Sequence, residues 1–387
     1  MRCGMTLYIQ NYEDWDRYEA MERGESVPPL EPQTDVRRFS QEIDMALKIE
    51  DQGFDSLWAV EHHISPYVLS TSPLQLLTFF AGATKRIDVG TMVIVVPWHE
   101  PLRVAEDITM LHNLLGPDRR AIIGFGRGAA RREFRQFRLD MNESRDRMSE
   151  GVQIIRKALT EESFSFEGEH YKLDRVTMRP RPRDPQQLLS DMSYSWGSPT
   201  SAAVGARLGL QPLIIPQKGW AEYHSDLSEF AKARAEMGYG PVRPRIHMTA
   251  ICAETEVEAE ALARKHLREY TDSATRIYEL HGSHFKAIKG YEHYAATASN
   301  VASRSAMVDT LSKTYIDNHV WGTPDQCIRK LQNIAKGFHP EEFMLAFRFG
   351  TMPNDVAQKS VDLFAREVLP AVHEIKTEEP ITYDEVA

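Results

Sequence analysis

The sequence predicts an α/β protein whose strands and helices form one (β/α)8 TIM barrel with insertions. Eight short runs rich in β-branched residues alternate with longer amphipathic stretches, which is the pattern of parallel βα units. The chain holds no Pro/Gly/Ser-rich linker, no low-complexity tract and no repeated block. A minimal barrel needs ~250 residues, so roughly 140 residues remain for insertions. We therefore expect a single domain over residues 1–387.

Each predicted strand is a short, mostly apolar run of the kind that a parallel sheet buries. The third run contains Val89, Ile94 and Val95 and is apolar almost throughout, as a central parallel strand should be. In chain order, the predicted strands span residues 3–9, 56–60, 87–95, 120–125, 189–195, 211–215, 245–252 and 342–347.

The predicted helices are bounded by start or stop signals. Proline begins several of them, as at Pro73 and Pro101, and glycine follows others, as at Gly53 and Gly116. In chain order, they span residues 35–52, 73–83, 101–115, 144–159, 200–208, 220–237, 324–336 and 355–373.

Two stretches are expected to be insertions. Within about 160–180, residues 164–173 place Gly168 between two alternating, aromatic-rich runs, which predicts a β-hairpin before the fifth strand. Residues from 268 to about 320 mix Tyr, His, Gly, Ala and Ser with weak periodicity. A long excursion between the seventh and eighth strands predicts a lid or a subunit contact.

Composition excludes several classes of protein. Lys and Arg number 46 against 56 Asp and Glu, and the net charge of −10 disfavours nucleic acid and anionic membranes as partners. No run approaches the ~18 apolar residues that span a membrane, and the first residues carry no small-residue cleavage site. Three cysteines, Cys3, Cys252 and Cys327, lack Cys-x-x-Cys spacing, so neither a disulfide framework nor a zinc site is expected. We expect a cytoplasmic protein.

Barrel enzymes carry their chemistry just after the strands, and Glu61-His62-His63 follows the second one. Neighbouring extended residues point to opposite sides, so only one of His62 and His63 should reach a ligand. The spacing does not suit a metal site, which needs His-x-His on one face or helical spacing. The remaining choice is between a catalytic histidine and a structural one.

After the fourth strand, residues 124–129 match the pattern G-x-G-x-x-A. A dinucleotide site is disfavoured because this is not the first strand unit and no acidic strand end follows. Arg127 lies within the loop, and Arg145 is close in sequence. Guanidinium groups bind phosphate oxygens in pairs, so the loop suits a monophosphate as well as a pyrophosphate.

After the fifth strand, Gly197 and Ser198 lead into a helix that contains Ser201. A serine at a helix start is first of all an N-cap. The same position can hold a phosphate, because the first N–H groups of a helix are unpaired and its N-terminus is positive. The residues alone leave both readings open.

Several segments, taken in order, resemble the bacterial luciferase-like flavin monooxygenases, most of all the luciferase α-subunit type. The likeness covers most of the chain except residues 10–33 and the large insertion. The segments that carry it are 53–58 (GFDSLW) with 61–63 (EHH), 89–97 (VGTMVIVVP), 126–128 (GRG), 134–137 (FRQF), 140–145 (DMNESR), 322–327 (GTPDQC) and 367–370 (EVLP).

The resemblance implies roles for particular residues. His62 matches the histidine that assists formation and protection of the flavin hydroperoxide. Met92 and Val93 match a non-prolyl cis peptide behind the flavin ring. The residues that match the flavin-phosphate site are Arg127, Arg145, Ser198 and Ser201. Two positions depart from the α subunit: Gly126 stands where it has cysteine and Gly197 where it has glutamate. These departures leave flavin binding in place and put light emission in doubt.

The resemblance also implies a function. We expect an enzyme that uses reduced FMN and O2, through a C4a-hydroperoxyflavin, for hydroxylation or Baeyer–Villiger oxidation of a small apolar molecule. A separate flavin reductase should supply the reduced FMN, because no nicotinamide fingerprint is evident, and family habit implies a homodimer. The alternatives are a deazaflavin-dependent dehydrogenase of the same fold and a non-catalytic flavin-binding subunit. Aromatic residues expected at the mouth are Trp58, Tyr67, Trp98, Trp196, Trp220 and Trp321.

Overall fold

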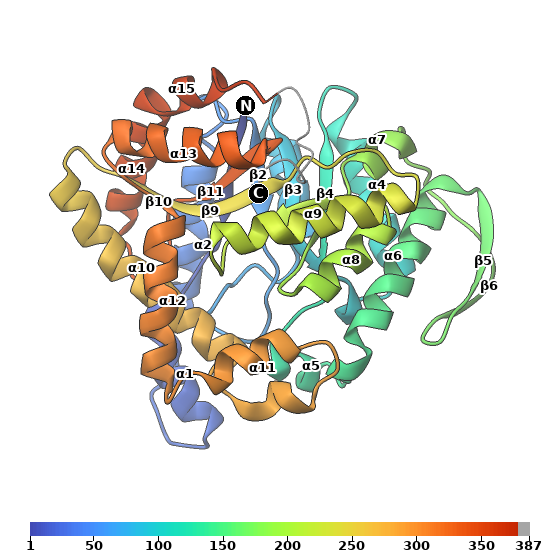
Figure 1. Cartoon of the computed structure of the whole chain (residues 1–387), viewed down its shortest axis with the longest axis horizontal. Coiled ribbons are helices and arrows are strands. Elements are labelled where there is room, and N and C mark those ends of the chain that lie inside the picture. Colours follow the sequence, from blue (N-terminus) through green and yellow to red (C-terminus); the bar gives the residue numbers. More distant parts are fainter. Residues whose placement is uncertain (378–387) are drawn as a thin grey trace.

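Eight parallel strands form a closed barrel in the computed structural model, which describes residues 1–377 (Figure 1). The barrel closes because β11 pairs with β1 on one side and with β9 on the other. The barrel strands are β1 (Arg2–Leu7), β2 (Ser56–Ala59), β3 (Asp88–Val95), β4 (Ala121–Gly126), β7 (Ser193–Ser195), β8 (Gln211–Ile214), β9 (Arg245–Cys252) and β11 (Glu342–Ala346). A further short strand, β10 (Val320–Gly322), pairs with the end of β9.

The burial of the strands explains why their positions could be predicted from apolar runs in the sequence. Every residue of β4, β9 and β11 is buried, since helices cover the barrel outside and side chains fill its inside. Predicted and observed strands agree within a few residues, and the (β/α)8 prediction is confirmed.

Most helices that surround the barrel lie in the predicted places, but α10 was not predicted. Pro101 begins α4, and Gly116 follows its last residue with φ of 81°, which glycine adopts without steric cost. The helices that cover the barrel are α2 (Pro32–Ala46), α3 (Pro73–Ala83), α4 (Pro101–Leu115), α6 (Ser144–Thr160), α8 (Pro199–Arg207), α9 (Trp220–Glu236), α10 (Glu256–Tyr278), α13 (Pro324–Phe338), α14 (Asn354–Glu367) and α15 (Leu369–His373).

Two predicted elements need correction. Residues 189–195 are not one strand, because a short helix, α7 (Pro185–Ser190), ends within them and only β7 remains. The side chain of Asp184 caps this helix by accepting from the N–H of Gln187. The last predicted helix, 355–373, is divided in two at Val368, where Pro370 ends the run of helical hydrogen bonds.

The expected hairpin is present as β5 (Ser163–Glu167) and β6 (Lys172–Thr177), which stand out from the barrel in Figure 1. The larger expected insertion begins later than predicted, since residues 268–278 belong to α10. Thr255 caps this 23-residue helix by accepting from the N–H of Glu258. After α10 come a 3-10 turn (Ser283–Ala287), α11 (Glu292–Ser299) and α12 (Arg304–Asn318), which packs along α10.

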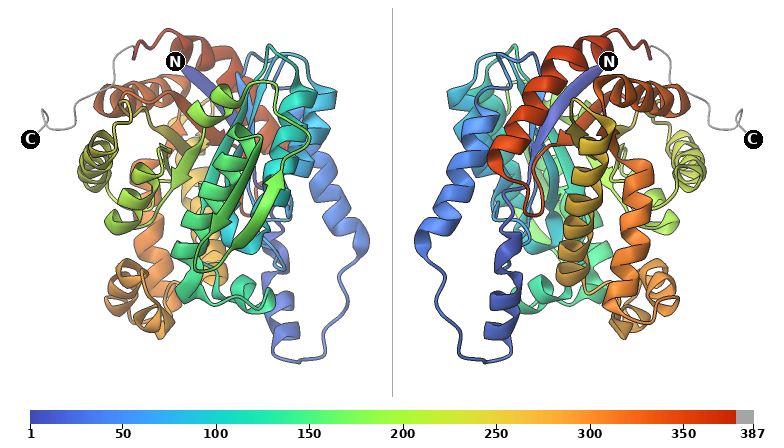
Figure 2. Two further views of the ribbon diagram at one scale, coloured as in Figure 1. Left: turned by 90° about the vertical axis from the view of Figure 1, so that its right-hand side faces the viewer. Right: turned by 90° about the vertical axis from the view of Figure 1, so that its left-hand side faces the viewer.

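A second insertion, after β1, was not predicted from the sequence. A 3-10 turn (Tyr12–Asp14) and α1 (Trp15–Glu22) pack against α10, where Trp15 Nε1 donates to Ser273 Oγ at 2.6 Å. The segment between α1 and α2 then extends away from the barrel (Figure 2). A short helix, α5 (Arg131–Gln136), follows β4, and Figure 1 shows α1, α5 and α11 at the same end of the barrel.

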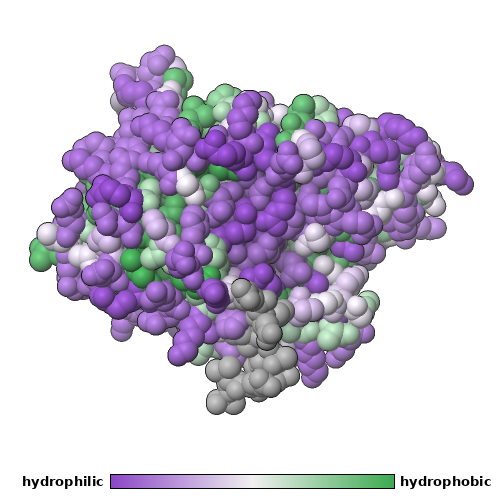
Figure 3. All heavy atoms as spheres, turned by 90° about the horizontal axis from the view of Figure 1, so that it is seen from above, coloured by the Kyte–Doolittle hydropathy of each residue, from purple (hydrophilic) through white to green (hydrophobic). Residues whose placement is uncertain are grey.

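Two kinds of structural feature are absent from residues 1–377. No helix in this range is long and apolar enough to cross a membrane. No group of three or more His, Cys, Asp and Glu side chains in the same range is placed to hold a metal ion. The molecular face shown in Figure 3 is mainly hydrophilic, with small apolar areas between charged side chains.

Candidate active site

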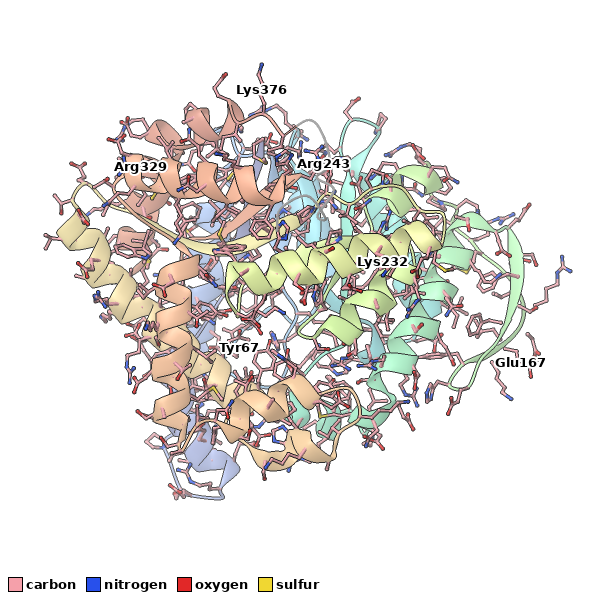
Figure 4. The ribbon with its side chains drawn as sticks, in the orientation of Figure 1. Tyr67, Glu167, Lys232, Arg243, Arg329 and Lys376 are labelled. Atoms are coloured by element: carbon pink, nitrogen blue, oxygen red, sulfur yellow. The ribbon has the colours of Figure 1, made fainter. Side chains whose placement is uncertain are left out.

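A cavity of about 160 Å³ opens at the C-terminal ends of the barrel strands. Residues that follow β1, β2, β4, β7 and β8 form one wall, and α10 and the segment after it form the other. Tyr67, which lines the cavity, lies between the strands and α11 in Figure 4. The cavity is therefore where a TIM barrel carries its chemistry.

Two arginines converge at one end of the cavity. Arg127 Nη2 donates to the Gly290 carbonyl at 2.6 Å, and Arg145 Nη2 does so at 3.5 Å. The guanidinium of Arg127 also lies 3.9 Å from the ring centre of Tyr291. Arg127 Nη1 and Arg145 Nε are buried and have no hydrogen-bond partner in the described part of the chain. Buried guanidinium groups with unfilled donors suit an anion with several oxygens.

The N-terminus of α8 lies beside these arginines. Arg145 Nη2 donates to Thr200 Oγ1 at 3.3 Å. Ser198 occupies the N-cap position, yet its hydroxyl donates to Ser201 Oγ at 3.0 Å and does not cap an N–H of the helix. Ser201 lines the cavity, and Ser198 lies directly behind it. Pro199 has no N–H, and the N–H groups of Ser201 and Ala202 donate to the Ser198 carbonyl, so the N–H of Thr200 and three hydroxyl groups add to the anion-binding donors.

The middle of the cavity has a wall of main chain and small residues. The Met92–Val93 peptide is cis, as the resemblance implied, and both residues line the cavity. A Cβ on Gly126 would lie 2.5 Å from Val93 Cγ2, and one on Gly197 would lie 2.3 Å from the hydroxyl of Tyr294. Glycine at both positions therefore lets Val93 and Tyr294 pack closely against the main chain of the cavity wall.

His62 lines the opposite end and is held from both ring nitrogens. Its Nδ1 lies 3.1 Å from Glu133 Oε1, and its Nε2 lies 2.9 Å from the hydroxyl of Tyr278. Glu133, on α5, is fully buried and also accepts from the N–H of His63 at 2.6 Å. A carboxylate only accepts, so Nδ1 of His62 donates to Glu133, and Nε2 shares a hydrogen bond with the Tyr278 hydroxyl.

His63 turns away from the cavity. Its ring packs edge-on against Trp98 and Phe137, and its Nε2 lies 2.9 Å from Glu61 Oε1. His99 Nε2 approaches the same oxygen at 2.5 Å. Burial raises the pKa of Glu61, but hydrogen bonds from both imidazoles outweigh burial and leave that pKa below its usual value. This buried carboxylate is an anchor for the loop that carries His62.

The floor of the cavity is a group of hydrogen-bonded tyrosines that we call the tyrosine row: Tyr278, Tyr67, Tyr270 and Tyr8. The Tyr67 and Tyr270 hydroxyls are 3.2 Å apart, and those of Tyr270 and Tyr8 are 3.1 Å apart. The Tyr8 hydroxyl lies 2.5 Å from Nε2 of His247, inside the barrel. Burial raises the pKa of all four phenols well above the usual value, so the row is neutral.

Three of the aromatic residues expected at the mouth line the cavity: Tyr67, Trp98 and Trp196. The other three lie elsewhere, which corrects the expectation. Trp58 is buried in the barrel and donates to Ser56 Oγ, Trp220 packs on Phe338, and Trp321 donates to the Ile316 carbonyl. The position of a residue at a strand end predicts that it lies near the mouth of the barrel. Whether its side chain points into the cavity depends on how the neighbouring side chains pack.

Three groups of the site were missed from the sequence: Glu133, Tyr278 and Gly290. Glu133 lies in an arginine-rich segment, and such a composition predicts a solvent-exposed surface. Tyr278 is the last residue of α10, and the Thr255-x-x-Glu258 pattern could have predicted that helix. No local signal marks Gly290, because its contacts with Arg127 and Arg145 span more than 140 residues of sequence.

Comparison with known proteins gives the same picture as the geometry. Residues 21–338 match the family described as luciferase-like monooxygenase. The alkanal monooxygenase alpha chain of Photorhabdus luminescens is 26% identical over 373 residues, covering 90% of this chain and 95% of the relative.

Solved structures share the fold. The oxygenating constituent of 3,6-diketocamphane monooxygenase from Pseudomonas putida, solved with FMN, aligns with a TM-score of 0.66 at 20% identity, covering 98% of this chain and 99% of that one. An F420-dependent secondary alcohol dehydrogenase aligns with a TM-score of 0.64 at 17% identity, covering 86% and 94%. At such identities the likeness concerns the fold alone. The fold is shared by one enzyme solved with FMN and by another that depends on F420.

Proposed function

Because this chain belongs to the luciferase-like monooxygenase family, we propose that it is the FMN-dependent oxygenase of a two-component system. The observation that carries the proposal is the pair of buried arginine nitrogens without a hydrogen-bond partner among the described residues, Arg127 Nη1 and Arg145 Nε, on two side chains that meet at the Gly290 carbonyl. A flavin mononucleotide has one terminal phosphate, and this donor set suits it. The substrates are O2 and a small, apolar organic molecule.

The residues present fit the proposed cofactor along the whole cavity. Arg127, Arg145, Ser198 and Ser201 would hold the phosphate. Met92, Val93, Gly126 and Gly197 would line the ring, where a side chain at either glycine would collide with its neighbours. When bound in its reduced form, FMN supplies two electrons that take one atom of O2 to water while the other enters the substrate.

His62 is the catalytic residue of the proposal. Glu133 fixes the proton on Nδ1, so Nε2 faces the cavity as a group that can accept, hold and return a proton. Tyr278 orients that nitrogen from the other side. A positioned imidazole controls which oxygen atom carries a proton, and this decides between hydroxylation and Baeyer–Villiger chemistry.

Exclusion of water falls to the segment between α10 and α12, residues 279–303. Leu280, Tyr291 and Tyr294 of this segment line the cavity. We propose that it opens to admit the flavin and closes over it, because the Gly290 carbonyl occupies the arginines that the phosphate needs.

The partners follow from the same proposal. A separate reductase supplies reduced FMN, and two copies of this chain form a homodimer. Both proteins act in the cytoplasm, where the buried free thiols of Cys3, Cys252 and Cys327 stay reduced.

One experiment tests the proposed function directly. Purified protein is mixed with reduced FMN, air and isotopically labelled O2, and oxygen uptake and label in the product are measured over a panel of organic molecules. We expect tight binding of reduced FMN and incorporation of one labelled atom. Binding of reduced F420 with hydride transfer and no oxygen uptake would establish the dehydrogenase alternative and contradict the proposal.

A further inference from the structure

His62 is held at its two ring nitrogens by side chains from two different elements. Its Nδ1 lies 3.1 Å from Oε1 of Glu133 on α5, and its Nε2 lies 2.9 Å from the hydroxyl of Tyr278, the last residue of α10. The Tyr278 ring also meets the imidazole edge-on, with the ring centres 5.5 Å apart. The orientation of the imidazole therefore depends on how α5 and the end of α10 are placed relative to each other.

One ion pair joins these two elements outside the cavity. Arg131 begins α5, and Glu279 directly follows Tyr278. Arg131 Nε donates to Glu279 Oε2 at 2.9 Å, and Arg131 Nη2 donates to Glu279 Oε1 at 2.7 Å. A guanidinium that contacts both oxygens of a carboxylate fixes its orientation as well as its distance. Neither residue lines the cavity, so the pair acts on the site only through its neighbours.

The contacts form a closed ring that passes through His62. Residues two apart in a helix point to nearly opposite sides, and on α5 the Arg131 side chain is half exposed while Glu133 is fully buried. From His62 the ring of contacts runs through Glu133, Arg131, Glu279 and Tyr278 and back to His62. A change at the ion pair therefore alters the spacing of the two groups that hold the imidazole.

Helix α5 depends on tertiary contacts for its position, because a helix of six residues is not stable on its own. Its Phe134 packs in one small cluster with aromatic residues of the segment 279–303, the proposed lid. Opening of the lid would remove that part of the packing. On the outer side of α5, Arg132 provides a looser tie, since its Nε lies 3.9 Å from Glu22. The two close contacts of Arg131 are therefore the firmer restraint.

Glu279 stays attached to α10 although it is the first residue of the proposed lid. Its backbone is left-handed, with φ of 50°, so the chain changes direction there. Its N–H nevertheless donates to the Thr275 carbonyl in the last turn of α10. The chain beyond Glu279 can therefore move while Tyr278 keeps its place.

Building on the proposed function, we infer that Arg131 and Glu279 are positioning residues for His62. Their ion pair keeps Glu133 and Tyr278 at the spacing that the imidazole needs, whether the lid is open or closed. The pair is partly exposed, and such pairs contribute little to the stability of a fold. Its effect is on the chemical step, because a displacement of about 1 Å at a reacting group can lower the rate ~100-fold.

The first test observes His62 in the protein without cofactor. NMR spectroscopy of protein labelled at the histidine nitrogens follows exchange of the His62 Nδ1 proton with water, and its signal is assigned by its absence in His62→Ala. Arg131→Ala and Glu279→Ala each remove the ion pair at a partly exposed position. Each should speed this exchange about threefold to fivefold, the range that one partly exposed ion pair supports. Unchanged exchange in both variants would overturn the inference.

The second test measures the rate at which hydrogen peroxide is released when protein loaded with reduced FMN is mixed with air. Arg131→Ala and Glu279→Ala should each raise this rate at least about threefold, with the affinity for reduced FMN unchanged. The double variant should be no worse than either single variant, because both residues act through one contact. Additive effects in the double variant would contradict the inference.

Arg264→Ala is the matched control for both tests. Arg264 forms an exposed ion pair with Glu260 on the same helix, α10, where its Nη2 lies 2.6 Å from Glu260 Oε1. Neither residue lines the cavity, so this variant should match the wild type in proton exchange and in peroxide release. Arg131→Lys keeps the charge but not the planar fork, and it should fall between Arg131→Ala and the wild type.

Failure of the inference and failure of the proposed function give different results. If wild-type protein with reduced FMN consumes oxygen but Arg131→Ala and Glu279→Ala match it in both tests, only the positioning role is wrong. If the wild-type protein neither binds reduced FMN nor consumes oxygen, the proposed function itself is wrong, and proton exchange still decides whether the ion pair positions His62.

Discussion

At the scale of single residues, His62 and His63 form a natural internal comparison. The two imidazoles are adjacent in sequence, are similarly exposed and each contact a buried glutamate. Only His62 reaches the cavity, where its Nε2 shares a hydrogen bond with the Tyr278 hydroxyl. Their substitution should therefore separate a catalytic role from a structural one.

We predict that His62→Ala retains reduced FMN binding but loses coupling of oxygen uptake to product. The phosphate contacts lie at the other end of the cavity, and loss of a positioned acid or base costs ~10²–10⁴ in the chemical step. Product should nearly vanish while hydrogen peroxide rises to match the oxygen used. His63→Ala should instead lower the melting temperature with coupling preserved. Equal behaviour of the two variants would remove the assignment.

The arginine pair leads to a second residue-scale prediction. Arg127→Ala should weaken reduced FMN binding roughly tenfold to a hundredfold, since a charge-assisted hydrogen bond contributes ~1.5–3 kcal/mol. Ser198→Ala should act in the same direction with a smaller effect, because its hydroxyl is neutral. Riboflavin, which lacks the phosphate, is the control ligand and should bind both variants nearly as well as the wild type. A comparable loss for riboflavin would assign these residues to the ring pocket or the fold.

At the scale of elements, the segment of residues 279–303 differs from the helices on either side of it. Its buried residues Phe285 and Tyr291 pack with Phe134 and Met141 in a small cluster separate from the main core. A small separate cluster gives less stabilisation than the barrel core and should open before the barrel unfolds.

Limited proteolysis should therefore cut first within residues 279–303. Bound FMN should slow this cutting, because the closed segment would cover the ligand. The β5–β6 hairpin is the control element: it projects from the barrel (Figure 1), and its cleavage rate should not depend on FMN. First cuts within α4 or α6, or no effect of FMN, would contradict a lid.

The same scale shows which elements sequence can predict. Strands β3 and β9 and helices α3 and α4 have strong local patterns, with apolar runs or proline and glycine at their ends, and their predicted bounds agree closely with the structure. Helix α10 was not predicted at all, although Thr255 marks its start, because residues 268–278 have a mixed composition with weak periodicity. Local patterns predict elements that the barrel buries, and they fail where helices pack on one another outside it.

The residues of the candidate site also fall into two groups, those that the sequence could predict and those that it could not. Residues that follow strands, such as His62, Arg127 and Ser198, could be proposed because a barrel brings strand ends together. Glu133 and Gly290 could not be proposed from the sequence, because their roles depend on contacts between inserted segments, and no local sequence pattern encodes such contacts.

At the scale of the whole molecule, two neighbouring helices expose large apolar side chains. Phe79 on α3 is 50% exposed, and Met110 and Leu114 on α4 are 53% and 58% exposed. The two helices pack against each other on the outside of the barrel. Grouped apolar side chains on a protein surface are typical of interaction sites. We assign this face to the proposed homodimer.

The double variant Phe79→Asp with Leu114→Asp should therefore be monomeric. Buried carboxylates in an apolar interface are costly, so sedimentation equilibrium should give half the wild-type mass at equal concentration. Val257→Asp is the matched control, because Val257 is 81% exposed on α10, away from this face, and its substitution should leave the mass unchanged. A wild-type protein that is already monomeric would contradict the assignment.

The Gly290 carbonyl has a consequence for how flavin affinity should be understood. By accepting from Arg127 and Arg145, it occupies part of the proposed phosphate site as an internal competitor. A flavin then binds only the fraction of molecules in which the competitor has withdrawn, so the measured dissociation constant is the intrinsic one divided by that fraction. Any flavin would then have to wait for this carbonyl to withdraw, and the rate of withdrawal would set the upper limit on capture.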